Sequence, residues 1–225
     1  MTVPLETGTA SALLDAAEAR FAADGFAGAS LRGIMRDAET DPGSIHYHFG
    51  GRPELAVGVL DRILVPLNDH RVRLLDTAVA AGQPSAAALV RALVTPDVEI
   101  AAELDTRGPG RARLVRAIYL EPETFVLHHV ERRFAPVAQR FAPHLANAIP
   151  DVAMAEIAWR VRWNVFPMVG AVLGDAAART SGSDLPAGAT HGQPLADRLV
   201  AAAVGALCAP TLATPPDRPR GEDHP

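Results

Sequence analysis

Side chains that can hydrogen-bond to nucleic acid gather in one short stretch of the chain. Between Ser44 and His48 the sequence reads S-I-H-Y-H, so a hydroxyl, two imidazoles and a phenol occur within a few residues. If this stretch is helical, Ile45 and Phe49 lie one turn apart and face inward, which leaves the polar side chains outward. A short helix that exposes such groups is typical of a recognition helix, which reads base edges in a DNA major groove.

A second helix is predicted immediately before this stretch. Its buried face is expected to consist of Leu31, Ile34, Met35 and Ala38, which follow helical spacing. Ser30 is expected to cap its first turn, because the hydroxyl can accept from a free backbone N–H. The break at residues 39–42 predicts a tight turn, with Asp41 as the next N-cap and Pro42 at the first position of the following helix.

The order of residue types resembles the TetR family of bacterial transcriptional regulators. The residues that carry the resemblance are Leu13-Leu14-Asp15-Ala16-Ala17, Phe21, Gly25-Phe26, the two helices above, and H-Y-H-F-G-G-R-P-E-L at 46–55. They cover the first quarter to third of the chain, and no motif is recognised beyond about residue 75. In this family an N-terminal DNA-binding domain precedes a larger helical domain that binds a ligand and dimerises.

Five positions depart from the family pattern. Met35 replaces the usual Ala, Glu39-Thr40 replaces Gly-Val in the turn, His46 replaces a frequent Tyr, and Arg52 replaces Lys. Arg52 should keep a phosphate contact, because both residues are cations of similar reach. Glu39 is expected to restrict the turn and to add negative charge near DNA.

The resemblance, together with the pattern and composition of the chain, predicts an all-α fold with four parts. These are a helix-turn-helix DNA-binding domain over 1–51, a connecting helix over 52–80, a ligand-binding and dimerisation domain over 81–209, and a disordered tail over 210–225. The expected helices are 9–24, ended by Gly25; 52–80, bent at Pro66; 85–108, interrupted at Pro96; and 111–120, 123–148, 151–178 and 194–208.

The DNA contacts divide into two kinds. Arg52 and Tyr47 would bind phosphates, Arg32 and Arg36 would add backbone contacts, and Ser44, His46 and His48 would reach base edges. The complete candidate set is Ser30, Arg32, Arg36, Ser44, His46, Tyr47, His48 and Arg52.

The C-terminal half offers candidates for a ligand pocket and a dimer interface. Aromatic residues with an occasional Arg or His suit an apolar molecule, acyl or other, with a polar or anionic end. The pocket candidates are Tyr119, Phe125, His128, Trp159, Arg162, Trp163, Phe166 and Met168, and the dimer candidates are Val169, Gly170, Leu173, Gly174, Leu199, Ala203 and Leu207. On pattern alone, both sets fit the core of a single chain as well; the family resemblance favours the dimer.

Net charge opposes DNA binding. The chain carries −5, all 21 basic residues are Arg, and the first 73 residues hold seven arginines against ten acids. Phosphate neutralisation dominates DNA affinity, so an acidic domain predicts weak, salt-sensitive binding unless the arginines share the docking face.

Other classes of function find no support among the residues. His46 and His48 diverge by about 200° on a helix and cannot chelate one ion. No nucleophile or phosphate-loop motif is present, so we expect neither an enzyme nor a cofactor. The single Cys208 suits a reducing cytoplasm, and no signal peptide or membrane-spanning run is evident.

Two functions are weighed. The first is a ligand-responsive, homodimeric regulator that binds palindromic double-stranded operator DNA, most simply as a repressor. The alternative is a helical small-molecule binding protein with weak or lost DNA binding, which the acidic N-terminal domain and Glu39 support.

Overall fold

The described part of the chain consists of helices joined by short turns. A computed structural model describes residues 8–107, 114–115, 118, 124–165 and 193–210. In chain order the elements are α1 (Gly8–Gly28), α2 (Leu31–Asp37), α3 (Ser44–Phe49), α4 (Arg52–Ala80), α5 (Ala86–Arg107), α7 (Thr124–Ala148), α8 (Met154–Arg160), the π-helical segment η1 (Val161–Val165) and α10 (Gln193–Cys208). The predicted all-α fold is confirmed.

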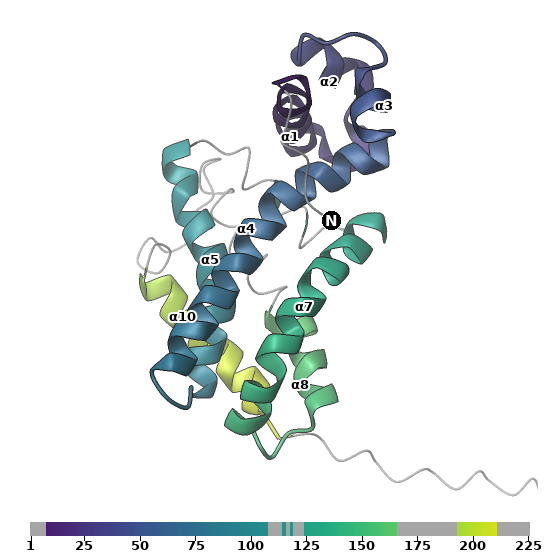
Figure 1. Cartoon of the computed structure of the whole chain (residues 1–225). Coiled ribbons are helices and arrows are strands. Elements are labelled where there is room, and N and C mark those ends of the chain that lie inside the picture. Colours follow the sequence, from purple (N-terminus) through teal and green to yellow (C-terminus); the bar gives the residue numbers. More distant parts are fainter. Residues whose placement is uncertain (1–7, 108–113, 116–117, 119–123, 166–192, 211–225) are drawn as a thin grey trace, which may run out of the picture.

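The first three helices form the small N-terminal unit at the top of Figure 1. The helical conformation of α1 is interrupted at Gly25, whose φ of 73° lies in the left-handed region, as predicted from the glycine. Phe21 and Phe26, on either side of this kink, pack with ring centroids 5.0 Å apart. Ile34 of α2 and Ile45 of α3 are buried in the same core.

The long helix α4 joins this unit to the rest of the chain (Figure 1). It contacts α1 and α3 near its beginning and α5 and α7 further along. The close approach to α1 depends on Gly58, where a Cβ atom would lie 2.9 Å from Cδ2 of Leu14. The helix continues through Pro66 and ends at Ala80, which confirms its predicted extent.

The prediction that Pro96 interrupts the next helix is wrong. Pro96 lies inside α5, which continues to Arg107. A proline removes one backbone hydrogen bond, but its neighbours Val94 and Val98 are buried here. The packing of this apolar face therefore stabilises the helix across the missing bond.

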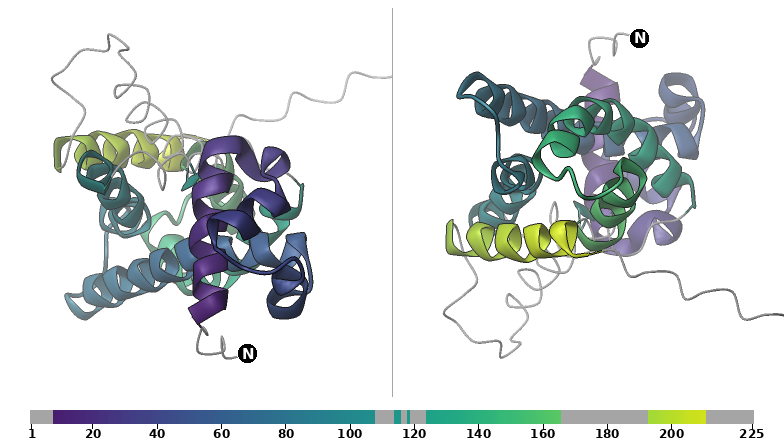
Figure 2. Two further views of the ribbon diagram at one scale, coloured as in Figure 1. Left: turned by 90° about the horizontal axis from the view of Figure 1, so that it is seen from above. Right: turned by 90° about the horizontal axis from the view of Figure 1, so that it is seen from below.

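The remaining helices complete the larger unit. Figure 2 shows α10 beside α5, and α8 lies against α7. The buried Arg160 connects α8 to the end of α10, because its Nη1 donates to the carbonyl oxygens of Leu207 (2.8 Å) and Ala209 (2.5 Å). The prediction of a helix over 123–148 is confirmed by α7, whereas most of 111–120, the part of 151–178 beyond 165 and the tail lie outside the described residues. Among the described helices, none has the length and apolar character needed to span a membrane.

Candidate functional site

The helix-turn-helix unit begins as the sequence predicts. The hydroxyl oxygen of Ser30 accepts a hydrogen bond from the backbone N–H of Gly33 at 3.4 Å, which caps α2. Capping rather than DNA contact is therefore the visible role of Ser30.

The predicted start of the second helix is wrong. Gly43, not Asp41, is the N-cap of α3, and Pro42 lies in the turn. The carbonyl oxygen of Asp41 accepts from the backbone N–H groups of Gly43 (2.9 Å) and Ser44 (3.1 Å). Because these backbone hydrogen bonds form the turn, α3 begins two residues later than it would with Asp41 as its N-cap.

The turn passes through a strained residue, Glu39. Its φ of 52° makes it the single non-glycine residue with positive φ in the described part of the chain. The N–H of Glu39 donates to the carbonyl of Arg36 (3.1 Å), and that of Thr40 donates to the carbonyl of Met35 (3.0 Å). This pair of bonds is the Schellman arrangement, which normally places glycine where Glu39 lies.

The outer face of α3 carries the predicted polar groups. Tyr47 is 85% exposed, and its ring meets that of His48 edge to face, with centroids 5.0 Å apart. His46 is exposed, whereas Ser44 and His48 are half-buried. Ile45 is buried beneath them, which anchors the helix with this face outward.

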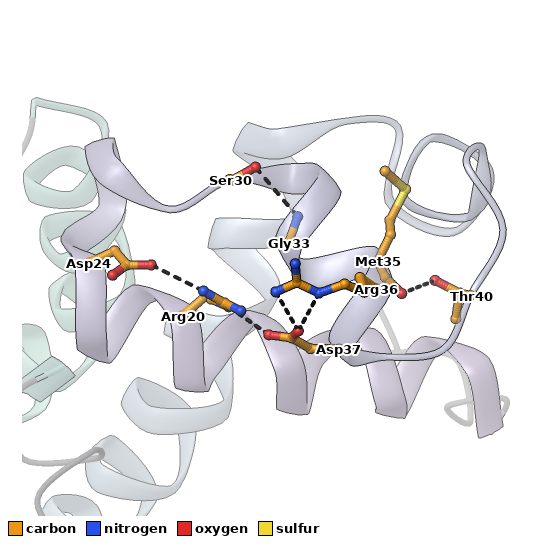
Figure 3. A network of polar contacts seen from close by, with 8 residues as sticks. All are labelled: Arg20, Asp24, Ser30, Gly33, Met35, Arg36, Asp37 and Thr40. Carbon is orange, nitrogen blue, oxygen red and sulfur yellow. Dashed lines mark hydrogen bonds and ion pairs between the residues drawn. The ribbon is translucent and has the colours of Figure 1, made fainter.

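An ion-pair network ties α2 to α1 (Figure 3). Nε of Arg20 donates to Oδ2 of Asp37 at 2.6 Å, and Arg36 contacts the other oxygen of the same carboxylate at 3.2 Å. The hydrogen bond from Arg20 holds the pKa of Asp37 below its ordinary value. Arg36 nonetheless remains largely exposed to solvent.

Arg52 has a structural partner that the sequence did not reveal. Its Nη2 donates to the carbonyl oxygen of Phe26, and to that of Ala27 at 2.8 Å, where α1 ends. A cation at the C-terminal end of a helix satisfies free carbonyls and offsets the helix dipole. Arg32 is exposed on α2. Residues 30–54 contain three arginines and four acidic residues, so this segment has no excess of positive charge.

The larger unit contains an apolar cavity of about 750 Å³. It lies among α4, α5, α7, α8 and η1, and its wall includes Leu64, Leu93, Val130, Phe134, Phe141, Leu145 and Ile157. Among the pocket candidates, Trp159, Arg162 and Trp163 line it. Phe125 and His128 lie elsewhere, since Phe125 packs edge-on against Phe26 of α1 and His128 is exposed. Tyr119, Phe166 and Met168 fall outside the described residues.

Sequence reasoning missed a buried polar cluster in the cavity wall. Arg71 is 1% exposed and pairs with the buried Asp97 at 2.5 Å. Asn68 accepts from Nη1 of Arg71 at 2.7 Å and donates to the carbonyl of Arg133 at 3.0 Å. The available signal was the position of Asn68 and Arg71 on the apolar stripe that runs from Leu67 to Leu75.

A second polar cluster joins α4 to α7. Asp61 of α4 lies 2.6 Å from Nε2 of His129 and accepts from Nε of Arg133 at 2.6 Å. Nδ1 of His129 lies 2.7 Å from Nη2 of Arg132, an arrangement that places the ring proton on Nε2. Burial raises the pKa of the Asp61 carboxyl, but the hydrogen bonds from Arg133 and His129 lower it more, so the net pKa lies below its ordinary value.

The candidate dimer residues divide between two regions. Val169, Gly170, Leu173 and Gly174 lie outside the described residues. Leu199, Ala203 and Leu207 are buried within the single chain, which matches the core interpretation of this stripe. Their side chains are therefore not available to a partner subunit in this arrangement. No three His, Cys, Asp or Glu side chains of the described residues are grouped to hold a metal ion.

Comparison with known proteins identifies both halves of the chain. The family model for bacterial regulatory proteins of the tetR family matches residues 13–59, and that for the tetracyclin repressor-like C-terminal domain matches residues 91–206. Fourteen chains of solved structures match. One is described as a TetR-family transcriptional regulator from Rhodococcus sp.; it is 16% identical, with a TM-score of 0.51 over 89% of this chain and 96% of that one, which shows a shared fold. No curated protein matches. The chain belongs to the TetR family and is a transcriptional regulator with an N-terminal DNA-binding domain and a C-terminal ligand-binding domain.

Proposed function

We propose that the protein is a homodimeric repressor, which leaves a palindromic operator when a small effector enters the cavity. One observation carries the proposal: α7 lines the cavity and, through Phe125 near its start, also contacts Phe26 of the DNA-binding unit. A regulator of transcription acts where the chromosome lies, which places it in the bacterial cytoplasm.

The exposed face of α3 supports direct reading of DNA. Tyr47 and His46 project from a helix whose opposite side, at Ile45, is buried. An imidazole can hydrogen-bond to base edges, and a phenol can donate to a phosphate oxygen. We therefore assign sequence preference to His46, with Ser44 and His48 beside it, and positioning to Tyr47, Arg32 and Arg36.

The contacts of α7 support coupling between the two ends of the molecule. Phe134 of α7 lines the cavity, while Phe125, near the start of the same helix, lies 6.0 Å from the ring of Phe26 in α1. A ligand that favours a shifted position of α7 thereby favours a shifted position of α1.

A parallel route runs through α4. Asp61 is bound by α7, and the adjacent Arg62 donates to Asp15 of α1 at 2.5 Å. Neighbouring residues of α4 thus connect α7, which lines the cavity at other positions, to the DNA-binding unit. In a symmetric dimer, a small displacement of each unit changes the spacing of the two α3 helices, which must match one helical turn of DNA or a multiple of it.

The alternative, a ligand-binding protein without useful DNA affinity, is favoured by the charge of the same surface. The acids Asp37, Glu39, Asp41 and Glu54 flank α3 in the sequence, and Arg52 donates to carbonyl oxygens at the end of α1. Counterion release would then be small, and so would the affinity.

A binding assay separates these functions. Purified protein is mixed with DNA that flanks its own gene, and with a random-sequence selection library, across a salt series with nonspecific competitor. A dimer-sized, competitor-resistant complex that weakens with salt is expected. Failure of a folded dimer to select any sequence would favour the ligand-binding alternative.

Three variants test the division of roles. Tyr47→Phe is expected to weaken binding to all sequences alike, because it removes only the hydroxyl that would reach a phosphate. His46→Ala is expected to change the preferred sequence. His128→Ala removes an exposed imidazole from α7 and should leave both properties unchanged. Equal, uniform losses from Tyr47→Phe and His46→Ala would contradict the assignment.

A further inference from the structure

The charged groups in the cavity wall are already paired with one another. Among the described lining residues, the charged side chains are Arg71, Glu131 and Arg162. Arg162 and Glu131 form an ion pair with each other, and both are partly exposed. Arg71 is the single one of the three that is deeply buried, so it decides which charge the interior of the cavity accepts.

The positive charge of Arg71 is fully compensated by the protein. Its Nη2 donates to Oδ2 of Asp97 at 2.5 Å, and the side chain of Asp97 is inaccessible to solvent. Its Nε donates to the carbonyl of Leu93 at 2.9 Å, and its Nη1 donates to Oδ1 of Asn68 at 2.7 Å. Every nitrogen of the guanidinium thus has an acceptor within the protein, and Arg71 with Asp97 contributes no net charge.

From this pairing we infer that the cavity takes an uncharged, predominantly apolar or aromatic molecule and rejects carboxylates, sulfonates and phosphates of the same shape. The inference deepens the proposed function, since it takes this cavity as the effector site. A buried anion needs a counter-charge, and Arg71 could supply one only by giving up Asp97, which would then itself be buried and unpaired.

The rest of the wall fits a neutral aromatic or hydrocarbon ligand. Phe134, Phe141, Trp159 and Trp163 line the cavity together with aliphatic side chains. The guanidinium of Arg71 also lies 5.8 Å from the centre of the Phe134 ring, which itself lines the cavity. A volume of about 750 Å³ is within the range of pockets that enclose drug-sized molecules.

The chain contains its own reporter for this site. It has two tryptophans, and both Trp159 and Trp163 line the cavity, so energy transfer from tryptophan reports a fluorescent ligand bound there. Two probes share one aromatic skeleton: N-phenyl-1-naphthylamine is neutral, and 8-anilinonaphthalene-1-sulfonate carries one negative charge. We expect the full-length protein without DNA to bind the neutral probe at least about tenfold more tightly. Equal affinities, tighter binding of the sulfonate, or no binding of either probe would overturn the inference.

Two matched variants test the cause of the selectivity. Asp97→Asn leaves Arg71 hydrogen-bonded but uncompensated, and it should reduce the preference for the neutral probe by about tenfold or more. Glu131→Gln also removes a carboxylate from an arginine, but at the partly exposed Arg162, where water screens the charge. It should change the preference less than about threefold. An Asp97→Asn protein with unchanged preference would overturn the assignment to Arg71.

A double variant decides the question if Asp97→Asn does not fold. The double variant Arg71→Met, Asp97→Leu removes both charges together. Because the Arg71–Asp97 pair has no net charge in the wild type, we expect the double variant to show the same probe preference as the wild type. A preference that rises tenfold would show that Arg71 attracts anions in the wild type and would overturn the inference. Because no DNA is present, these results stand apart from the operator-binding assay: failure there refutes the regulator, and failure here refutes only the ligand class.

Discussion

Replacing Glu39 by glycine is expected to stabilise the helix-turn-helix and to strengthen its binding to DNA. Glu39 holds a φ of 52° at the end of α2, a conformation that an L-residue adopts at a cost of roughly 1–2 kcal/mol. Glycine adopts it freely but loses about 0.5–1 kcal/mol more in backbone entropy on folding. The expected gain in the free energy of unfolding is therefore about 0.5–1 kcal/mol, or roughly 1–4 °C in Tm for a chain of this size.

A second variant separates strain from charge. Glu39→Gln keeps a side chain in the left-handed conformation but removes the negative charge, which is unfavourable both at a helix C-terminus and near phosphate. Both variants should bind DNA more tightly than the wild type. Only Glu39→Gly should also relieve the backbone strain at this position, so its free energy of unfolding should exceed that of Glu39→Gln.

Urea unfolding at one fixed protein concentration measures the difference, since the stability of a dimer depends on concentration. A free energy of unfolding for Glu39→Gly no higher than that for Glu39→Gln would refute the argument from backbone strain. Unchanged DNA affinity in both variants would refute the argument from charge.

Three further substitutions test contacts of the connecting helix. Arg52→Ala should lower the free energy of unfolding by about 1–2 kcal/mol, because the carbonyl of Phe26 loses a charged donor; unchanged thermal stability without DNA would free Arg52 for phosphate contact. The lowered pKa of Asp61 adds stability that is present above its unfolded pKa and is lost as pH falls through the folded one. In Asp61→Asn, the free energy of unfolding measured with urea should therefore decrease less steeply below about pH 4 than in the wild type, and an equally steep decrease would contradict this. Gly58→Ala should destabilise the protein by about 1–3 kcal/mol in thermal unfolding, whereas Gly205→Ala, where a Cβ meets no atom within 4 Å, should not; equal effects would exclude a steric cause.

The N-terminal unit was predictable because local signals and packing agree there. Ser30 caps α2, Gly25 interrupts α1, and Ile34 with Ile45 face the core, as their spacing indicates. The start of α3 was not predictable, because the turn uses backbone bonds at Gly43 instead of the side chain of Asp41. Main-chain closure of this kind leaves no distinct residue pattern.

The cavity was only partly predictable for a different reason. Trp159 and Trp163 were found from aromatic content, but Asp97, the carboxylate that compensates Arg71, lies on another helix, 26 residues away in the sequence. Which arginine meets which acid depends on how the helices pack, and spacing along one helix does not determine it. Helix continuity through Pro96 likewise results from burial against neighbouring helices, which outweighs the local propensity of proline.

Prolines inside the helices around the cavity have a mechanical consequence. α4 contains Pro66, α5 contains Pro96, and α7 contains Pro136 and Pro143. Each proline already lacks a backbone N–H, so a bend at that turn breaks no hydrogen bond that a straight helix would keep. The helices around the cavity can therefore bend at these prolines without losing further backbone hydrogen bonds. We expect the regulator to tolerate a range of effector sizes, so that one protein answers several chemically related compounds.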